Sequence, residues 1–110
     1  MIPVFRTVLI VGIALGFCQP ALAYKSGNEL LSQCSNRNNL FELGQCYGFI
    51  EGTLETGNDG RIFCIPSRGV THGQVYNIVT HYLEGHPEQL RYFAATLVLV
   101  AVGIAFPCQR

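Results

Sequence analysis

The stretch "VTHGQVYNIVTHYLEGHP" (residues 70–87) decides the fold, because it carries the signals of a helix from its start to its end. Thr71 is followed three residues later by Gln74, the pattern of a capping box in which each side chain bonds a backbone N–H at the other position. Apolar residues then recur at helical spacing: Val75, Ile78, Val79, Tyr82 and Leu83. Gly85 suits a helix exit. The stretch therefore predicts an amphipathic helix over residues 71–84.

Two further helix patterns precede it, and each begins with a residue that can cap a helix. Ser26 opens a helix predicted over residues 26–36, and Asn39 opens one that runs to about Thr56. Both have a glutamate three residues later, as a capping box requires. The second pattern has a narrow apolar seam made of Leu40, Leu43, Tyr47, Ile50 and Leu54. Both patterns predict helices with one face toward a core.

A fourth helix is predicted from Pro87 to about residue 105. The valines at 98, 100 and 102 leave a strand as the alternative. Residues 93–106 carry no charge, which raises the question of a membrane span. Fourteen helical residues rise about 21 Å, whereas a bilayer core needs about 30 Å. We therefore expect a helix buried in protein, within an all-α bundle of four main helices.

This last helix has two apolar seams on different sides. The first is Leu90, Ala94, Leu97, Ala101 and Ile104, and the second is Ala95, Val98, Val102 and Ala105. A helix that is apolar all round is a buried one, and three other helices can hardly cover it in so small a domain. We therefore expect a homodimer in which a second copy covers Ala95, Val98, Val102 and Ala105.

Residues 1–23 have the pattern of a cleaved signal peptide. One basic side chain, Arg6, precedes an apolar run, and the small residues of "ALA" (21–23) predict cleavage after Ala23. A lipoprotein signal centred on Cys18 is the competing interpretation, but Phe17 is bulky where that processing favours a small residue. Residues 24–110 would then form a single exported helical domain in the periplasm.

Four cysteines follow the signal, at positions 34, 46, 64 and 108. An even number in a small exported domain predicts two disulfides, and three pairings are open. The first two predicted helices should pack antiparallel, which makes Cys34 and Cys46 natural neighbours and leaves Cys64 with Cys108. A zinc site is the rival, but it usually draws two ligands from one tight turn, and these cysteines are at least 11 residues apart.

Charge and motifs argue against several functions. The chain carries seven basic and seven acidic side chains, and loss of the leader with Arg6 leaves six against seven. This balance disfavours a nucleic-acid binder. No catalytic serine elbow, zinc-protease motif or phosphate loop is present. His72, His81 and His86 lack a metal spacing and are interpreted as surface or cap residues. We expect no enzyme activity, cofactor or metal, and a protein partner.

The glycines of "GQCYGFIEG" (44–52) recur every four residues, at 44, 48 and 52. Each costs up to about 1 kcal/mol relative to alanine inside a helix, so they need a reason. Close approach by a neighbouring helix is one interpretation. The other is a shallow surface for a partner, with Glu51, Glu55 and Asp59 as an acidic edge.

The order of several short pieces resembles the Rap/Tai family of immunity proteins of type VI secretion. They are "LLSQC" (30–34), "CYGFIEG" (46–52), "FCIP" (63–66), "VTHGQVYNIVTHYLEGHPE" (70–88) and "AFPC" (105–108). The resemblance implies a small helical periplasmic protein, often a homodimer, that binds a toxic effector and blocks its active site. The effector of the best-known members is a peptidoglycan amidase. One departure is that "VLVAVGIAF" (98–106) lacks the polar residues of typical members.

Two groups of exposed residues are candidates for binding such a partner. They are the helix edge and turn, Glu51, Glu55, Asn58, Asp59 and Arg61, and the later corner, Glu84, His86 and Glu88. Two alternatives belong to other classes. A periplasmic acid-stress chaperone similar to HdeA would also be small, helical and disulfide-bonded, and a scaffold subunit would have neither role.

Overall fold

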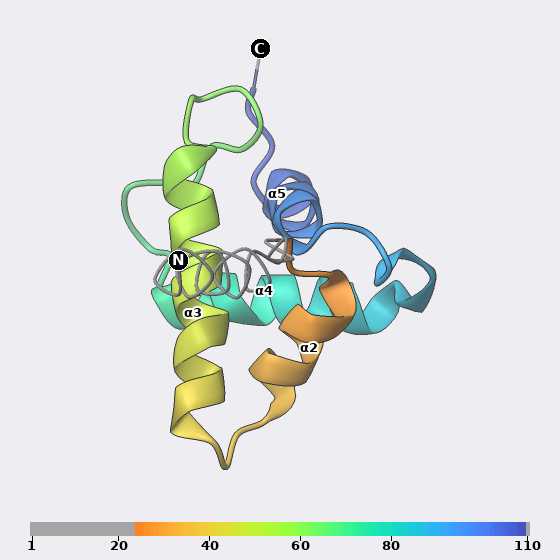
Figure 1. Ribbon diagram of the computed structural model, residues 1–110. Helices are drawn as coiled ribbons and strands as arrows, with labels where there is room; N and C mark the ends of the chain where they lie inside the picture. Colours follow the sequence, from red (N-terminus) through yellow and green to blue (C-terminus); the bar gives the residue numbers. More distant parts are fainter. Residues whose placement is uncertain (1–23, 110) are drawn as a thin grey trace, which may run out of the picture.

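The computed structural model describes residues 24–109, and the predicted signal peptide lies outside them. The described chain contains four α-helices and one short 3-10 helix, with no strand beyond a single isolated bridge (Figure 1). The elements are α2 (Gly27–Ser35), α3 (Leu40–Thr56), α4 (His72–Gly85), η1 (Pro87–Gln89) and α5 (Ala94–Ala105). The all-α prediction is therefore confirmed over this part of the chain.

The three predicted helix starts are present. The side chains of Ser26 and Asn39 accept hydrogen bonds from the backbone N–H three residues on, at 3.2 and 3.1 Å. At α4 both halves of the capping box form. Thr71 Oγ1 accepts from the Gln74 N–H at 3.1 Å, and Gln74 Oε1 accepts from the Thr71 N–H at 2.8 Å. These bonds satisfy backbone donors that a helix start leaves without partners.

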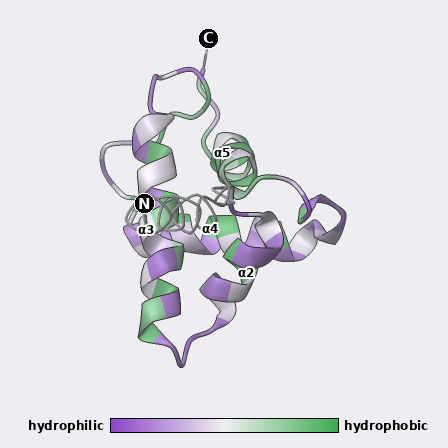
Figure 2. Ribbon diagram, viewed as in Figure 1, coloured by the Kyte–Doolittle hydropathy of each residue, from purple (hydrophilic) through white to green (hydrophobic). Residues whose placement is uncertain are grey.

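The core forms where α5 packs against α3 and α4 (Figure 1). α2 packs mainly on α3 and also contacts α4 and α5. The largest fully buried side chains are Leu30, Cys46, Ile50, Val79, Leu83, Val98 and Val102. Hydrophobic residues are concentrated in α5 (Figure 2). Leu40, part of the predicted seam of α3, is instead 84% exposed, and Cys46 and Ile50 make the buried face. The first turn of α3 thus contributes nothing to the core.

The predicted fourth helix is wrong in its first half. Residues 87–105 form η1, then a bend, and only then α5. The cause is a hydrogen-bonding competition: the Gly27 N–H donates to the Tyr92 carbonyl and the Asn28 N–H to the Leu90 carbonyl, both at 2.9 Å. These carbonyls satisfy the start of α2, where the first N–H groups have no partner within their own helix. The chain bends at 90–93 to present them.

The predicted dimer seam is only half exposed. Val98 and Val102 have no exposed surface within a single chain, so a second copy cannot cover them, whereas Ala95 and Ala105 are exposed. The expectation considered only helices as cover. The non-helical segment 57–70 also lies on α5, at Leu99 and Gly103, so that one chain covers more of this helix than the other helices alone.

Segment 57–70 packs closely on α5 through its backbone and supplies one aromatic ring to the core. A Cβ added at Gly103 would lie 2.9 Å from the carbonyl oxygen of Ile62, so this position has room only for glycine. Phe63 is 2% exposed and belongs to the core. A segment without helical pattern therefore supplies a wall of the domain.

Both predicted disulfides are present. Cys34 and Cys46 join the end of α2 to α3, with Cα atoms 5.1 Å apart. Cys64 and Cys108 join segment 57–70 to the end of the described chain, with Cα atoms 4.9 Å apart. The Cys64 N–H also donates to the Phe106 carbonyl at 2.8 Å. The second disulfide thus fixes segment 57–70 over the end of α5.

Candidate partner-binding site

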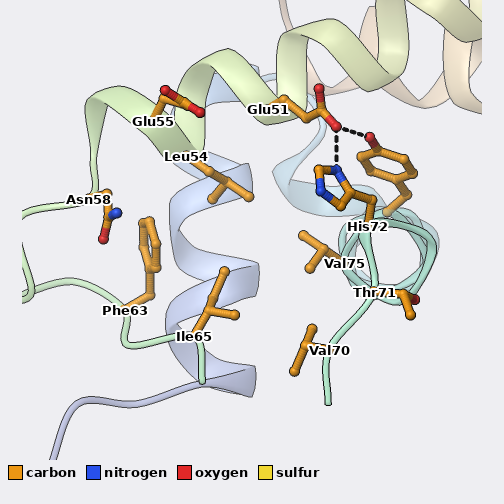
Figure 3. A pocket seen from close by; sticks show the side chains of 11 residues that line it. Glu51, Leu54, Glu55, Asn58, Phe63, Ile65, Val70, Thr71, His72 and Val75 are labelled. Carbon is orange, nitrogen blue, oxygen red and sulfur yellow. Dashed lines mark hydrogen bonds and ion pairs between the residues drawn. The ribbon is translucent and has the colours of Figure 1, made fainter. Parts of the chain in front are cut away.

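A pocket of about 410 Å³ lies between α3, segment 57–70 and the start of α4 (Figure 3). Its lining residues are Glu51, Leu54, Glu55, Asn58, Phe63, Ile65, Val70, Thr71, His72, Val75 and Tyr76. Three of the predicted partner-binding residues, Glu51, Glu55 and Asn58, are among them. The structure therefore brings part of the first predicted group to one concave site.

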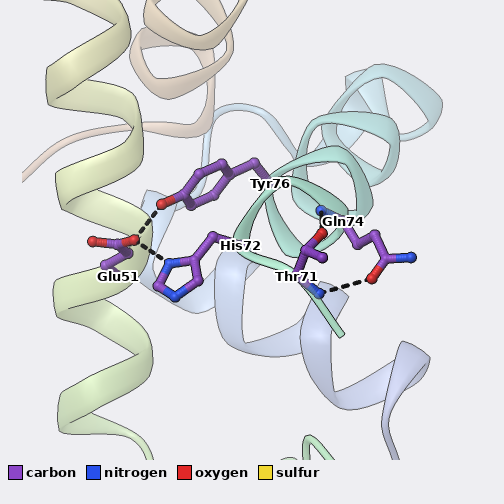
Figure 4. Close-up of polar contacts among 5 residues, drawn as sticks. All are labelled: Glu51, Thr71, His72, Gln74 and Tyr76. Atoms are coloured by element: carbon purple, nitrogen blue, oxygen red, sulfur yellow. Dashed lines mark hydrogen bonds and ion pairs between the residues drawn. The ribbon is translucent and has the colours of Figure 1, made fainter. Parts of the chain in front are cut away.

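Helix spacing places the polar groups of this pocket. Glu51 and Glu55 are four residues apart on α3, which puts them on neighbouring turns of one face. His72 and Tyr76 have the same spacing on α4, and the Thr71 cap fixes where that helix begins. The two faces meet at the pocket, where both α4 side chains point toward Glu51 (Figure 4).

Glu51 joins the two helices. Its Oε1 atom lies 2.6 Å from His72 Nδ1 and accepts a hydrogen bond from the Tyr76 hydroxyl. The Tyr76 ring stacks on that of Tyr47, with centroids 4.3 Å apart and planes 9° from parallel. The side chains of Glu51 and His72 are 46% and 80% exposed, so the contact is open to solvent and to a partner.

These contacts shift two pKa values in opposite directions. The hydrogen bonds from Tyr76 and then His72 lower the pKa of the Glu51 carboxyl, because they favour its charged form. Partial burial and then the hydrogen bond to Glu51 raise the pKa of Tyr76 to about 12. The Glu51 contact thus stabilises the fold at neutral pH, and that contribution is lost as the pH falls through the lowered pKa of the carboxyl.

The Tyr76 hydroxyl gives a spectroscopic test of this contact. We expect one of the five tyrosines, Tyr76, to ionise with a pKa of about 12. Ultraviolet absorbance after a rapid pH jump measures this ionisation. Glu51→Gln should lower that pKa, because the carboxylate charge opposes formation of tyrosinate. The raised pKa also means that stability is lost as the pH rises toward about 12. An unchanged titration in Glu51→Gln would show that Glu51 and Tyr76 are not in contact in solution.

The other predicted residues lie outside the pocket. Asp59 and Arg61 are exposed in the turn after α3, where Asp59 Oδ1 accepts from the Arg61 N–H at 2.9 Å. Glu84 and Glu88 are exposed near the end of α4. His86, expected to be a surface or cap residue, is the C-cap of α4, and its ring stacks on Tyr82 with centroids 4.0 Å apart. The two predicted groups are therefore separate surfaces.

A second, more apolar groove of about 570 Å³ lies between α4 and α5. Its lining residues are Asn77, Ile78, His81, Tyr82, Gly85, His86, Ala101, Ile104 and Ala105. It contains His86 from the predicted corner and Ala105 from the predicted dimer seam. Ile104, from the other seam, is 67% exposed at its edge.

The glycines of α3 do not serve close helix packing. A Cβ added at Gly44, Gly48 or Gly52 would meet no atom within 4 Å. The interpretation as a close approach by a neighbouring helix is therefore wrong. The three glycines instead leave a shallow exposed strip on α3, beside Tyr47 and Glu51.

Only three of the eleven residues that line the pocket were predicted from the sequence as partner-binding residues. His72 was interpreted as a surface or cap residue, and Tyr76 was not singled out, although both contact Glu51 across 21 and 25 positions. The i, i+4 spacing of these two residues was the one local signal. The apolar walls Phe63 and Ile65 come from a segment without periodicity, so no pattern pointed to them.

Free thiols, metal-binding clusters and membrane-spanning helices are not found among residues 24–109. Both cysteine pairs are disulfides, so no described cysteine is a free thiol. Within residues 24–109 no three His, Cys, Asp or Glu side chains are grouped to hold a metal ion. None of the described helices is long and apolar enough to cross a membrane. What the pocket offers is carboxylates, hydrogen-bonding side chains and an apolar wall.

Comparison with known families identifies the chain. The family model of Rap1a immunity proteins matches residues 26–108, which include the four α-helices of the described residues and both disulfides. No curated protein and no solved structure matches. The match covers most of the chain and extends from the cap of the first described helix to the last cysteine. The chain therefore belongs to the Rap1a immunity protein family.

Proposed function

We propose that this protein binds a secreted effector in the periplasm and blocks its active site, and that the effector is a peptidoglycan amidase. The observation that carries the proposal is the family match over residues 26–108. Two disulfides fit an oxidising compartment such as the periplasm. The predicted signal peptide at residues 1–23 would deliver the protein there.

The pocket between α3 and α4 is the surface that we assign to the effector. Glu51, Glu55 and Asn58 line it, and the exposed Asp59 lies one residue beyond. A surface with several carboxylates favours fast encounter with a basic protein, because opposite charges steer association. The exposed glycine strip beside it would let a partner's backbone come close.

The test uses the effector whose gene the immunity function predicts beside the gene of this protein. Co-expression with this protein should protect cells from lysis when the effector is directed to the periplasm. Reversing the charge at Glu51, Glu55 and Asp59 to lysine should slow association by about tenfold at low salt, and the difference should shrink as salt is added. Biolayer interferometry gives the association rate.

Two comparison variants locate the surface. Glu29→Lys, on α2 and outside either predicted group, should leave the rate near the wild-type value. Glu84→Lys with Glu88→Lys tests the second predicted group. A slowing by this pair, with none from the pocket reversals, would move the effector site to the end of α4. Lysis despite co-expression would contradict the immunity function itself.

The family match favours immunity over the acid-stress chaperone alternative.

A homodimer remains a prediction, and the interface predicted for it has to change. Because Val98 and Val102 are buried, a second copy would meet Ala105 and Ile104 at the α4–α5 groove. Static light scattering at micromolar concentration measures the oligomeric state directly.

A further inference from the structure

We propose that the pocket between α3 and α4 accepts an arginine side chain of the effector, with the guanidinium at Glu51 and Glu55 and the aliphatic stem on the apolar wall. This inference rests on the proposed function, since it names the group by which the effector is held.

The pocket is apolar below its rim. Leu54 enters it from α3, Ile65 from segment 57–70 and Val75 from α4 (Figure 3). Phe63 also lines the pocket and is almost fully buried. A volume of about 410 Å³ holds one long side chain. Such a wall favours a side chain with methylene groups, because long cationic residues bury their stems along apolar surface.

The rim is acidic and lacks a permanent cation. Glu51 uses Oε1 for both of its contacts with α4, which leaves the other carboxylate oxygen open. Within residues 24–109, the carboxylate of Glu55 makes no hydrogen bond and no ion pair. No lysine or arginine lines the pocket, and His72 is the one ionisable base there. The rim is therefore complementary to a cation from outside.

The geometry of the rim favours arginine over lysine. Carboxylates four residues apart on a helix have Cβ atoms about 6 Å from each other. A planar guanidinium has five N–H donors in a fixed fork and can bond two such groups, whereas an ammonium is a compact point charge. The Tyr76 ring also lines the pocket, and guanidinium groups stack well on aromatic faces.

The first test uses the protein alone with small probes. Nα-acetyl-arginine amide is titrated into isotopically labelled protein and followed by amide chemical shifts. We expect saturable shifts at residues around the pocket, such as Leu54, Ile65 and Val75. The citrulline amide has the same shape without the charge and should give no saturable shift. The lysine amide should bind more weakly than the arginine amide.

Variants at the rim sharpen the test. Glu55→Gln keeps the shape of the pocket and removes a carboxylate that makes no contact in the fold, so it should weaken arginine binding about tenfold without unfolding. Glu29→Gln, on α2, removes one negative charge outside the pocket and should leave the binding unchanged. In the effector complex, Glu55→Gln should raise the dissociation rate constant about tenfold.

Equal shifts from the arginine and citrulline amides would overturn the inference, as would shifts centred on the α4–α5 groove. Wild-type binding by Glu55→Gln would overturn it too. The two proposals fail separately. If the protein protects cells from the effector but its pocket does not bind the arginine amide, only this inference is contradicted. A pocket that binds arginine in a protein that gives no protection against lysis contradicts the immunity function.

Discussion

Replacing Cys64 and Cys108 by alanine is expected to lower the free energy of unfolding by about 4 kcal/mol, the chain-entropy value for a loop of this length. The disulfide closes the longer of the two loops, with a separation of 44 residues. A loss of this size is comparable with the total stability of a small domain. Urea unfolding followed by circular dichroism measures it.

The Cys34–Cys46 disulfide is the matched control. Its separation is 12 residues, and the same relation gives about 3 kcal/mol for its removal. The two losses should also differ in kind. Phe63 and Ile65 flank Cys64 and line the pocket, so loss of the second disulfide should loosen the pocket as well. The prediction would be contradicted if both double variants lost the same free energy of unfolding and the arginine amide still shifted the amide signals of the pocket as in the wild type.

Gly27→Ala is expected to destabilise the protein by about 2 kcal/mol, the usual cost of overpacking a tight contact. A Cβ at this position would lie 2.5 Å from Leu97 Cδ1 and 3.0 Å from the Cα and carbonyl oxygen of Leu90. The leucine side chain can rotate away, but the backbone at Leu90 can move only if the bonds from α2 to residues 90 and 92 lengthen. Thermal and urea unfolding give the value.

Gly44→Ala is the control, because the same substitution should have the opposite sign there. Nothing lies within 4 Å of a Cβ at Gly44, which is in the interior of α3. Alanine should therefore stabilise the protein by up to about 1 kcal/mol through helix preference. Destabilisation at Gly44, or neutrality at Gly27, would show that helix packing in solution differs from the structure.

The sequence predicted the elements whose information is local. The caps at Ser26, Asn39 and Thr71 and the periodicity of α4 depend on residues within one or two turns, and all were found in place. The disulfide pairing also followed, because a short loop between two helices constrains how they pack. The fold class could therefore be read from the chain alone.

The errors arose where distant segments compete for the same groups. Residues 87–93 have helical preference, but the carbonyls of Leu90 and Tyr92 bond to the start of α2 instead. Likewise, Val98 and Val102 are buried within one chain, where α5 packs against α3 and α4 and segment 57–70 lies beside it at Gly103. Neither contact leaves a periodic signal in the sequence.

Only three of the eleven residues that line the candidate site were predicted as partner-binding, for the same reason. Glu51 and Glu55 share one helix face, so their neighbourhood was visible in the sequence. Their partners His72 and Tyr76 come from a helix more than 20 positions away, and only the packing of α3 on α4 brings them together. A long-range hydrogen bond cannot be inferred from spacing within either helix.

The bonds between the start of α2 and residues 90 and 92 also bear on the order in which the protein is made. The start of α2 lacks its backbone partners until residue 92 has been synthesised. The Cys64–Cys108 disulfide can form only after residue 108 has been added. The complete set of long-range contacts can therefore form only when nearly the whole chain is present. Under the proposed export by a signal peptide, a chain that folds only when it is nearly complete would stay unfolded, and able to pass through a translocation channel, until most of its length had crossed.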